Sequence, residues 1–258
     1  MDIRREILRN VILSQALEPM GRKPGITSRL ADASPGTKLE YFIISGVNSA
    51  WAFYDLVDRI LREGKQPDCI FDTAFEAQAA SVRNRYGSKV NYGQILLLVP
   101  LVAAQALIYL ETEGIDDVDA ILERTGQVLR QTTCKDVEFL EKFIGLGHEL
   151  SARHHERMGR PKPPRERYFQ GKTYPNVWES FTDYLHIHAV REMVERYQHS
   201  ERVYRFLLHN LDDGVLPASD MIYTLLVPEL GRHDIAADMI ACGLYLALSA
   251  HPETVLFT

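Results

Sequence analysis

The sequence is poor in cysteine and has no long uninterrupted apolar run, and each shortage excludes a class of protein. Its three cysteines, Cys69, Cys134 and Cys242, lie far apart and form no C-x-x-C pair. This usage argues against a disulfide framework or a cysteine zinc site, and it predicts a protein of the reducing cytoplasm. The longest apolar run, Ile95 to Ala104, contains Pro100 and is too short to span a bilayer. We therefore expect it to form a buried helix, with no membrane partner.

Basic residues are fewer than acidic ones. The chain has 29 Lys and Arg residues against 35 Asp and Glu residues, which gives a net charge of −6. This balance disfavours a nucleic-acid partner, although it leaves room for a local basic pocket. Several enzyme motifs are missing as well, among them the GxSxG elbow, the GxxxxGK[ST] phosphate loop and the HExxH zinc pattern.

What the sequence does contain is helical spacing in nearly every long segment, without the alternation typical of strands. We predict a single all-α domain over residues 1–258, a multi-helix bundle of about ten helices. One expected helix ends at Gly64, which we predict to be its C-terminal cap. The expected helices span about 3–18, 38–63, 72–85, 94–112, 115–131, 138–158, 176–198, 201–210, 218–226 and 234–250.

A basic connector without helical period lies at about 159–175, with the sequence GRPKPPRERYFQGKTYP. Loops of this length are uncommon inside a domain and are often functional. Its cations could cover an anionic ligand, and the alternative is a solvated surface loop. The aromatic residues of the connector and the C-terminal VLFT leave a homodimer open.

The first polar segment that could support chemistry is LEPMGRKPGITSRL, which interrupts the opening helix. Lys23 and Arg29 offer cations for phosphate, and Gly25 lets a ligand approach the backbone. Glu18 and Asp32 add carboxylates, the oxygen ligands that Mg²⁺ prefers. The alternative interpretation is a turn between two helices with exposed charges.

A second polar segment, RNRYGSKVNYGQILLLVPL, leads directly into the most apolar helix. Its turn contains Gly87, Ser88, Lys89, Asn91 and Gly93. A helix start offers free N–H groups to an anion, and a nearby lysine strengthens such a site. An ordinary capping loop is the alternative.

Five histidines lie in two groups. His148, His154 and His155 fall on one predicted helix, whereas His186 and His188 are two residues apart and therefore on different faces of another. Their spacing does not require a metal. We interpret them as surface or hydrogen-bonded histidines.

These segments resemble the triphosphoribosyl-dephospho-coenzyme A synthase family over the first 110 residues. Members begin with a helix ending in Glu, a Pro-Lys-Pro-Gly turn, an acidic segment and a Phe-x-x-Ser helix. The segment SKVNYGQILLLVPLVAAQAL of this chain is similar to a second block of the family, most closely as it reads in the archaeal branch. The segment GRHDIAADMIACG is similar to a Gly-rich turn followed by Ala-Asp-Leu that many members carry. The residues that fall on these patterns are Glu18, Lys23, Pro24, Gly25, Phe42, Ser45, Asn91, Gly93 and Asp238.

The chain also departs from the family in its second block. The family's Asn-Thr-His-Lys-Gly turn has Asn91 here in place of its histidine and Tyr92 in place of its lysine. The family's Gly-x-His-x-Asp-Met segment is replaced by LADASPGTKLEYF, which has neither the histidine nor the Asp-Met pair. These departures leave a different acceptor substrate open.

The resemblance implies an all-helical transferase that joins the ribose of ATP to a hydroxyl of dephospho-coenzyme A, keeps the triphosphate and releases adenine. It implies a magnesium ion, a small-molecule nucleotide or phosphoribosyl substrate, and a role in coenzyme or prosthetic-group biosynthesis. An alternative is a helical ligand- or partner-binding protein that has lost the chemistry, and another is a purely structural protein. The implied site has Glu18 and Asp32 as catalytic residues, Lys23, Gly25, Arg29, Ser45, Asn91 and Gly93 as substrate-binding residues, and Glu18, Asp32 and Asp238 as metal ligands.

Overall fold

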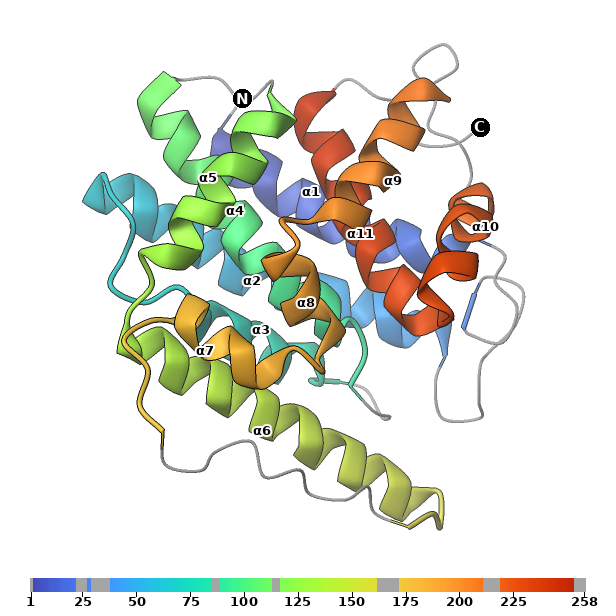
Figure 1. Ribbon diagram of the computed structural model, residues 1–258. Coiled ribbons are helices and arrows are strands. Elements are labelled where there is room, and N and C mark those ends of the chain that lie inside the picture. Colours follow the sequence, from blue (N-terminus) through green and yellow to red (C-terminus); the bar gives the residue numbers. More distant parts are fainter. Residues whose placement is uncertain are drawn as a thin grey trace.

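The computed structural model describes residues 2–21, 27–28, 38–84, 89–112, 117–161, 172–210 and 219–252. Within these ranges the chain forms eleven α-helices and one 3₁₀ turn (Figure 1), which confirms the all-α prediction. The elements are α1 (Ile3–Leu17), η1 (Glu18–Met20), α2 (Leu39–Glu63), α3 (Phe71–Ser81), α4 (Tyr92–Thr112), α5 (Val118–Arg130), α6 (Cys134–Arg157), α7 (Val177–Tyr184), α8 (His188–Val194), α9 (Gln198–His209), α10 (Ser219–Leu230) and α11 (His233–Ala250).

Helix α4 is the centre of the bundle. Every residue from Gly93 to Leu107 is buried, and the helix contacts α1, α2, α3, α5, α8 and α11. By length and composition alone α4 could cross a membrane, but 83% of its most apolar window is buried inside the protein. Burying one large aliphatic side chain contributes about 1.5–3 kcal/mol to folding. The apolar run is therefore the core helix that the sequence predicts.

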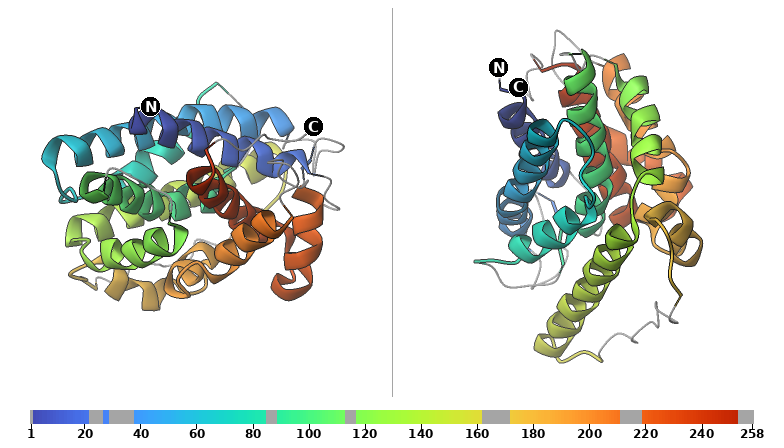
Figure 2. Two further views of the ribbon diagram at one scale, coloured as in Figure 1. Left: turned by 90° about the horizontal axis from the view of Figure 1, so that it is seen from above. Right: turned by 90° about the vertical axis from the view of Figure 1, so that its left-hand side faces the viewer.

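Helix α6 projects beyond the rest of the bundle (Figure 2) and packs against α3 and α7. It begins at Cys134, four residues before the predicted start, because Thr133 and Asp136 form a capping box. The same Asp136 carboxylate accepts the backbone N–H groups of Ile70 and Phe71, at 2.7 and 2.9 Å. One buried carboxylate thus caps α6 and fixes the start of α3.

The predicted helix over 176–198 is wrong, because this segment is divided into α7, α8 and the start of α9. Arg196 and Tyr197 have φ angles of 57° and 61°, which ends α8. The Tyr197 hydroxyl donates to the Leu97 carbonyl of α4 at 2.8 Å, and the Tyr197 N–H donates to the Glu192 carbonyl at 2.8 Å. These tertiary bonds stabilise a backbone conformation that helical periodicity does not reveal.

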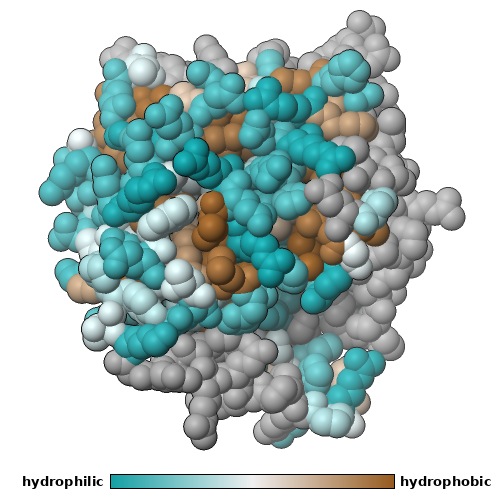
Figure 3. All heavy atoms as spheres, viewed as in Figure 1, coloured by the Kyte–Doolittle hydropathy of each residue, from teal (hydrophilic) through white to brown (hydrophobic). Residues whose placement is uncertain are grey.

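The face in Figure 3 is covered mainly by polar side chains, with apolar residues in small separate groups. Single exposed apolar residues are normal on a soluble protein. Residues 162–171 of the basic connector and the VLFT end lie outside the described residues. The homodimer and the ligand-covering role of the connector therefore stay predictions.

Candidate active site

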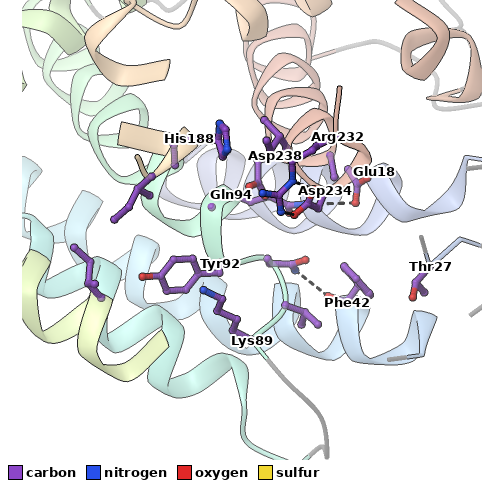
Figure 4. A pocket seen from close by; sticks show the side chains of 18 of the residues that line it. Glu18, Thr27, Phe42, Lys89, Tyr92, Gln94, His188, Arg232, Asp234 and Asp238 are labelled. Carbon is purple, nitrogen blue, oxygen red and sulfur yellow. Dashed lines mark hydrogen bonds and ion pairs between the residues drawn. The ribbon is translucent and has the colours of Figure 1, made fainter. Parts of the chain in front are cut away.

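A cavity of about 560 Å³ opens where the end of α1, the turn before α4 and the start of α11 meet. Residues of α2, α6 and α8 complete its walls. Figure 4 shows side chains from these elements converging on one space. The cavity lies beside the N-terminal end of the buried helix α4, where the sequence leaves a ligand site and a capping loop as alternatives.

The turn before α4 is held by the Asn91 side chain. Asn91 has a φ angle of 54°, a conformation that asparagine tolerates better than most residues, and its carbonyl accepts the Ile95 N–H at 2.8 Å. Its side-chain amide donates to Gln15 Oε1 at 2.9 Å and to the Phe42 carbonyl at 3.1 Å. Asn91 therefore joins α1, α2 and α4, and its amide donor is used for structure.

Gly93 lets α11 come close to the start of α4. A Cβ atom at this position would lie 1.9 Å from Oδ2 of Asp238, far inside contact distance. The backbone N–H of Gln94 hydrogen-bonds the Asp238 carboxylate. Glycine at this position therefore allows a carboxylate to lie against the helix start, and Asp238 occupies the Gln94 N–H, one of the groups that a phosphate could otherwise use.

Glu18 brings a second carboxylate to the cavity. Glu18 is the first residue of the 3₁₀ turn η1, and Pro19 follows it in a position that cannot continue the α1 helix. The Tyr223 hydroxyl of α10 donates to Glu18 Oε1 at 2.6 Å, and Gln94 Nε2 donates to Oε2 at 3.4 Å. Burial and the adjacent Glu18 carboxylate raise the pKa of Tyr223, so the phenol keeps its proton and acts as the donor.

The charge of Glu18 acts on the Asp238 carboxyl group. Burial raises the pKa of Asp238 well above its usual value, and the charges of Glu18 and Asp234 raise it further. The Gln94 N–H and the Lys89 ammonium act in the opposite direction. This end of the cavity therefore favours a proton or a bound cation.

Aromatic residues and a lysine form another wall. The Lys89 ammonium lies 4.1 Å from the centre of the Tyr92 ring, which stacks on Phe143 with centres 4.3 Å apart. A Cβ atom on Gly147 would lie 2.4 Å from the Tyr92 ring. The ring that stands where the family has a lysine is thus packed against α6, and Lys89 supplies a cation nearby.

Three histidines line the cavity, a placement that the sequence does not predict. His148 comes from α6, His186 from the turn after α7 and His188 from the first residue of α8. The prediction that His186 and His188 lie on different faces of one helix is wrong, because the helix ends at Tyr184. No periodicity in the sequence marks this turn.

A profile of the ATP:dephospho-CoA triphosphoribosyl transferase family matches residues 4–227. The chain belongs to this family. It is therefore a transferase of the triphosphoribosyl-dephospho-CoA synthase type. A crystal structure from Archaeoglobus fulgidus, provisionally named triphosphoribosyl-dephospho-coA synthase, has a similar fold, with a TM-score of 0.50 and 19% sequence identity. The similarity covers 80% of this chain and 97% of that one. A comparison with curated proteins finds no match.

Four of the predicted residues of this transferase meet at the cavity: Glu18, Asn91, Gly93 and Asp238. They come from three segments that are far apart in the sequence, and Thr27 from the opening loop joins them. Ser45 is fully buried in α2 and is not among the residues that line the cavity. Lys23, Gly25, Arg29 and Asp32 lie outside the described residues, so their roles stay predictions.

A magnesium ion is compatible with the residues present. Glu18 and Asp238 place hard carboxylate oxygens on one cavity, and Mg²⁺ typically binds one or two carboxylates together with substrate phosphates. Among the described residues, one cluster of three donors lies within 4.8 Å, and it is Glu192, Glu195 and His199. Glu192 there accepts the Ser200 N–H and hydroxyl at 2.8 and 2.9 Å, so it serves as a helix cap.

Proposed function

We propose that the chain transfers the triphosphoribosyl group of ATP to a hydroxyl group and releases adenine. Dephospho-CoA is the first acceptor to test, because the family is named for it. The observation that carries the proposal is the convergence of Glu18, Asn91, Gly93 and Asp238 on one cavity. Three segments that resemble family motifs thus contribute to a single site.

The transfer breaks the bond between C1′ of the ribose and N9 of adenine, and adenine leaves with the electron pair. The acceptor oxygen bonds to C1′ and loses its proton. Positive charge develops on the ribosyl group in such a displacement, and a fixed carboxylate near it lowers the barrier. Glu18 suits this role, because Tyr223 and Gln94 hold both of its oxygens in place.

The triphosphate requires cations on another side of the site. Lys89 lines the cavity and lies two residues before Asn91 in the turn. Lys23 and Arg29 of the opening loop are proposed to add to it. A magnesium ion held by Glu18 and Asp238 would neutralise phosphate charge when bound. A cavity of about 560 Å³ falls within the ordinary size of small-molecule sites, roughly 300–1,000 Å³.

The test is direct detection of products. The protein is incubated with ATP, magnesium and either dephospho-CoA or other hydroxyl-bearing acceptors, and adenine is separated by chromatography while the second product is weighed by mass spectrometry. We expect adenine release that depends on an acceptor, with a product heavier by one triphosphoribosyl group.

Glu18→Gln is the matched variant, because it keeps the shape of the side chain and one acceptor oxygen for the Tyr223 hydroxyl but removes the charge. We expect it to reduce adenine release by about 100-fold or more, the typical effect of removing one electrostatic group from a site. ATP binding without adenine release for any acceptor would instead favour the alternative of a non-catalytic ligand-binding protein.

A further inference from the structure

The transfer reaction needs a group that accepts the proton of the attacking hydroxyl, and the family's motif histidine is absent here. Asn91 stands in its place, and its amide is committed to Gln15 and Phe42. Glu18 accepts hydrogen bonds at both carboxylate oxygens. Asp238 accepts a backbone N–H and is confined by the start of α4. The motif residues described in the structure therefore have other tasks.

The cavity contains a different set of proton acceptors. His148, His186 and His188 reach it from α6, from the turn after α7 and from the start of α8, and none of them belongs to the motifs that contain Glu18, Asn91, Gly93 and Asp238. His186 is exposed, and His148 follows Gly147, the residue against which the Tyr92 ring packs. His188 is half-buried and lies on the side of the cavity where Figure 4 shows Asp238 and Arg232.

We propose that His188 is a catalytic residue that accepts the proton of the attacking hydroxyl group. The inference rests on the proposed function, since it names the base of that same site. Helix α8 contacts both α4 and α11, the two helices that carry the motif residues Gly93 and Asp238. The fold thereby fixes His188 at the site, although His188 is distant in the sequence from both motif residues.

The surroundings of His188 keep its imidazole neutral. Burial lowers the pKa of His188, and the charges of Arg191 and Arg232 lower it further, while Asp234 raises it in part. A neutral imidazole has a free lone pair at physiological pH, which is what a general base requires. The other ionisable groups that line the cavity are Glu18 from η1, Lys89 from the turn before α4, Tyr92 from α4, His148 from α6, His186 from the turn after α7 and Asp238 from α11.

The proton balance of the step is simple. The O–H bond of the acceptor breaks, its electron pair forms the new O–C1′ bond, and the proton moves to a ring nitrogen of His188. The electron pair of the C1′–N9 bond leaves with adenine, which takes a proton from water. The imidazolium then returns its own proton to solvent, so no further reactant is needed.

The experiment compares His188→Ala and His188→Gln with His154→Ala, using adenine release as the readout. His154 is a matched control, because burial also lowers its pKa but it does not line the cavity. We expect kcat to fall by about 10²–10⁴-fold in the His188 variants, the usual contribution of general base catalysis, with KM for ATP nearly unchanged. Added imidazole is expected to restore part of the activity of His188→Ala and to leave His154→Ala unaffected.

The pH profile separates a base from a structural residue. In the wild type, kcat is expected to decrease as pH falls through the pKa of His188, because the imidazolium cannot accept a proton. The His188 variants are expected to lose this acidic limb. Melting temperatures confirm folding, and His188→Gln replaces the alanine variant if the latter unfolds.

Two results would overturn the inference in different ways. An active wild type whose His188 variants keep both kcat and the acidic limb would refute the role of His188 and leave the transferase function standing. A wild type that releases no adenine with any acceptor would refute the proposed function, and the inference with it.

Discussion

The contact between Gly93 and Asp238 makes the substitution Gly93→Ala a sharp test of the site. The new methyl group would lie 1.9 Å from Oδ2, 2.5 Å from Cγ and 3.0 Å from Oδ1 of Asp238. The carboxylate must therefore rotate away and give up its hydrogen bond to the Gln94 N–H, or the two helices must separate. Both responses displace a group that we place in the active site.

The expected cost follows from three contributions. Overpacking a buried contact costs about 1–3 kcal/mol, and leaving a buried polar group unpaired costs about 1–3 kcal/mol. Replacing a helical glycine by alanine returns about 1 kcal/mol. We expect Gly93→Ala to lose about 1–5 kcal/mol of unfolding free energy, which lowers the melting temperature by about 2–20 °C for a chain of this size.

Gly145→Ala is the matched control, because a Cβ atom on this glycine of α6 meets nothing within 4 Å. We expect this variant to melt slightly above the wild type and to keep its activity. Asp238→Ala should relieve the crowding, so the double variant with Gly93→Ala is expected to be more stable than additivity predicts, by about 1 kcal/mol or more.

The assays are thermal melting by circular dichroism and acceptor-dependent adenine release. Gly93→Ala is expected to be folded at 25 °C but to release adenine at least about 100-fold more slowly, since it displaces an electrostatic group of the site. The reasoning is refuted if Gly93→Ala melts as high as Gly145→Ala, or if its cost adds independently to that of Asp238→Ala.

Two further predictions concern a charge and a buried hydrogen bond. The pKa of Asp238 is raised in the folded protein, so the folded state keeps a proton that the unfolded chain releases. The free energy of unfolding therefore falls as pH rises above about 4, which is the pKa of an unperturbed aspartate. Asp238→Asn is expected to weaken this pH dependence and to melt at a higher temperature than the wild type at higher pH without magnesium. Melting temperatures that change equally with pH in the two proteins would contradict this prediction. Tyr197→Phe leaves the Leu97 carbonyl of α4 without its hydroxyl donor and is expected to cost about 1–3 kcal/mol in urea unfolding, whereas an unchanged midpoint would show that water replaces the hydroxyl.

Local sequence signals predict the features that local chemistry controls. Gly64 ends α2 with a φ angle of 67°, as its position after a long helical period indicates. The apolar run of α4 becomes the core helix, because burial removes its many aliphatic side chains from water. Glu18, Asn91 and Gly93 reach the cavity because they lie where helices end or begin, and the resemblance marked those positions.

Features set by contacts between distant residues could not be predicted from one sequence. Tyr223 holds Glu18 across a separation of 205 residues, and no local pattern indicates this pair. The histidines of the α7–α8 turn reach the cavity only because the chain breaks at Tyr184 and at Tyr197. Hydrogen bonds from Tyr197 to the carbonyls of Leu97 and Glu192 stabilise the second break, and helical periodicity does not indicate these bonds.

Magnesium-dependent ATP binding tests most directly whether the cavity is the nucleotide site. The measurement is the shift in melting temperature on adding ATP, with and without magnesium, in the wild type, in Glu18→Gln and in the control Gly145→Ala. At 100 times the dissociation constant, binding stabilises the folded state by about 2.7 kcal/mol, which is a shift of several degrees. We predict a magnesium-dependent shift in the wild type and Gly145→Ala that is greatly reduced in Glu18→Gln. An equal shift in all three proteins would contradict the account, because ATP would then bind elsewhere.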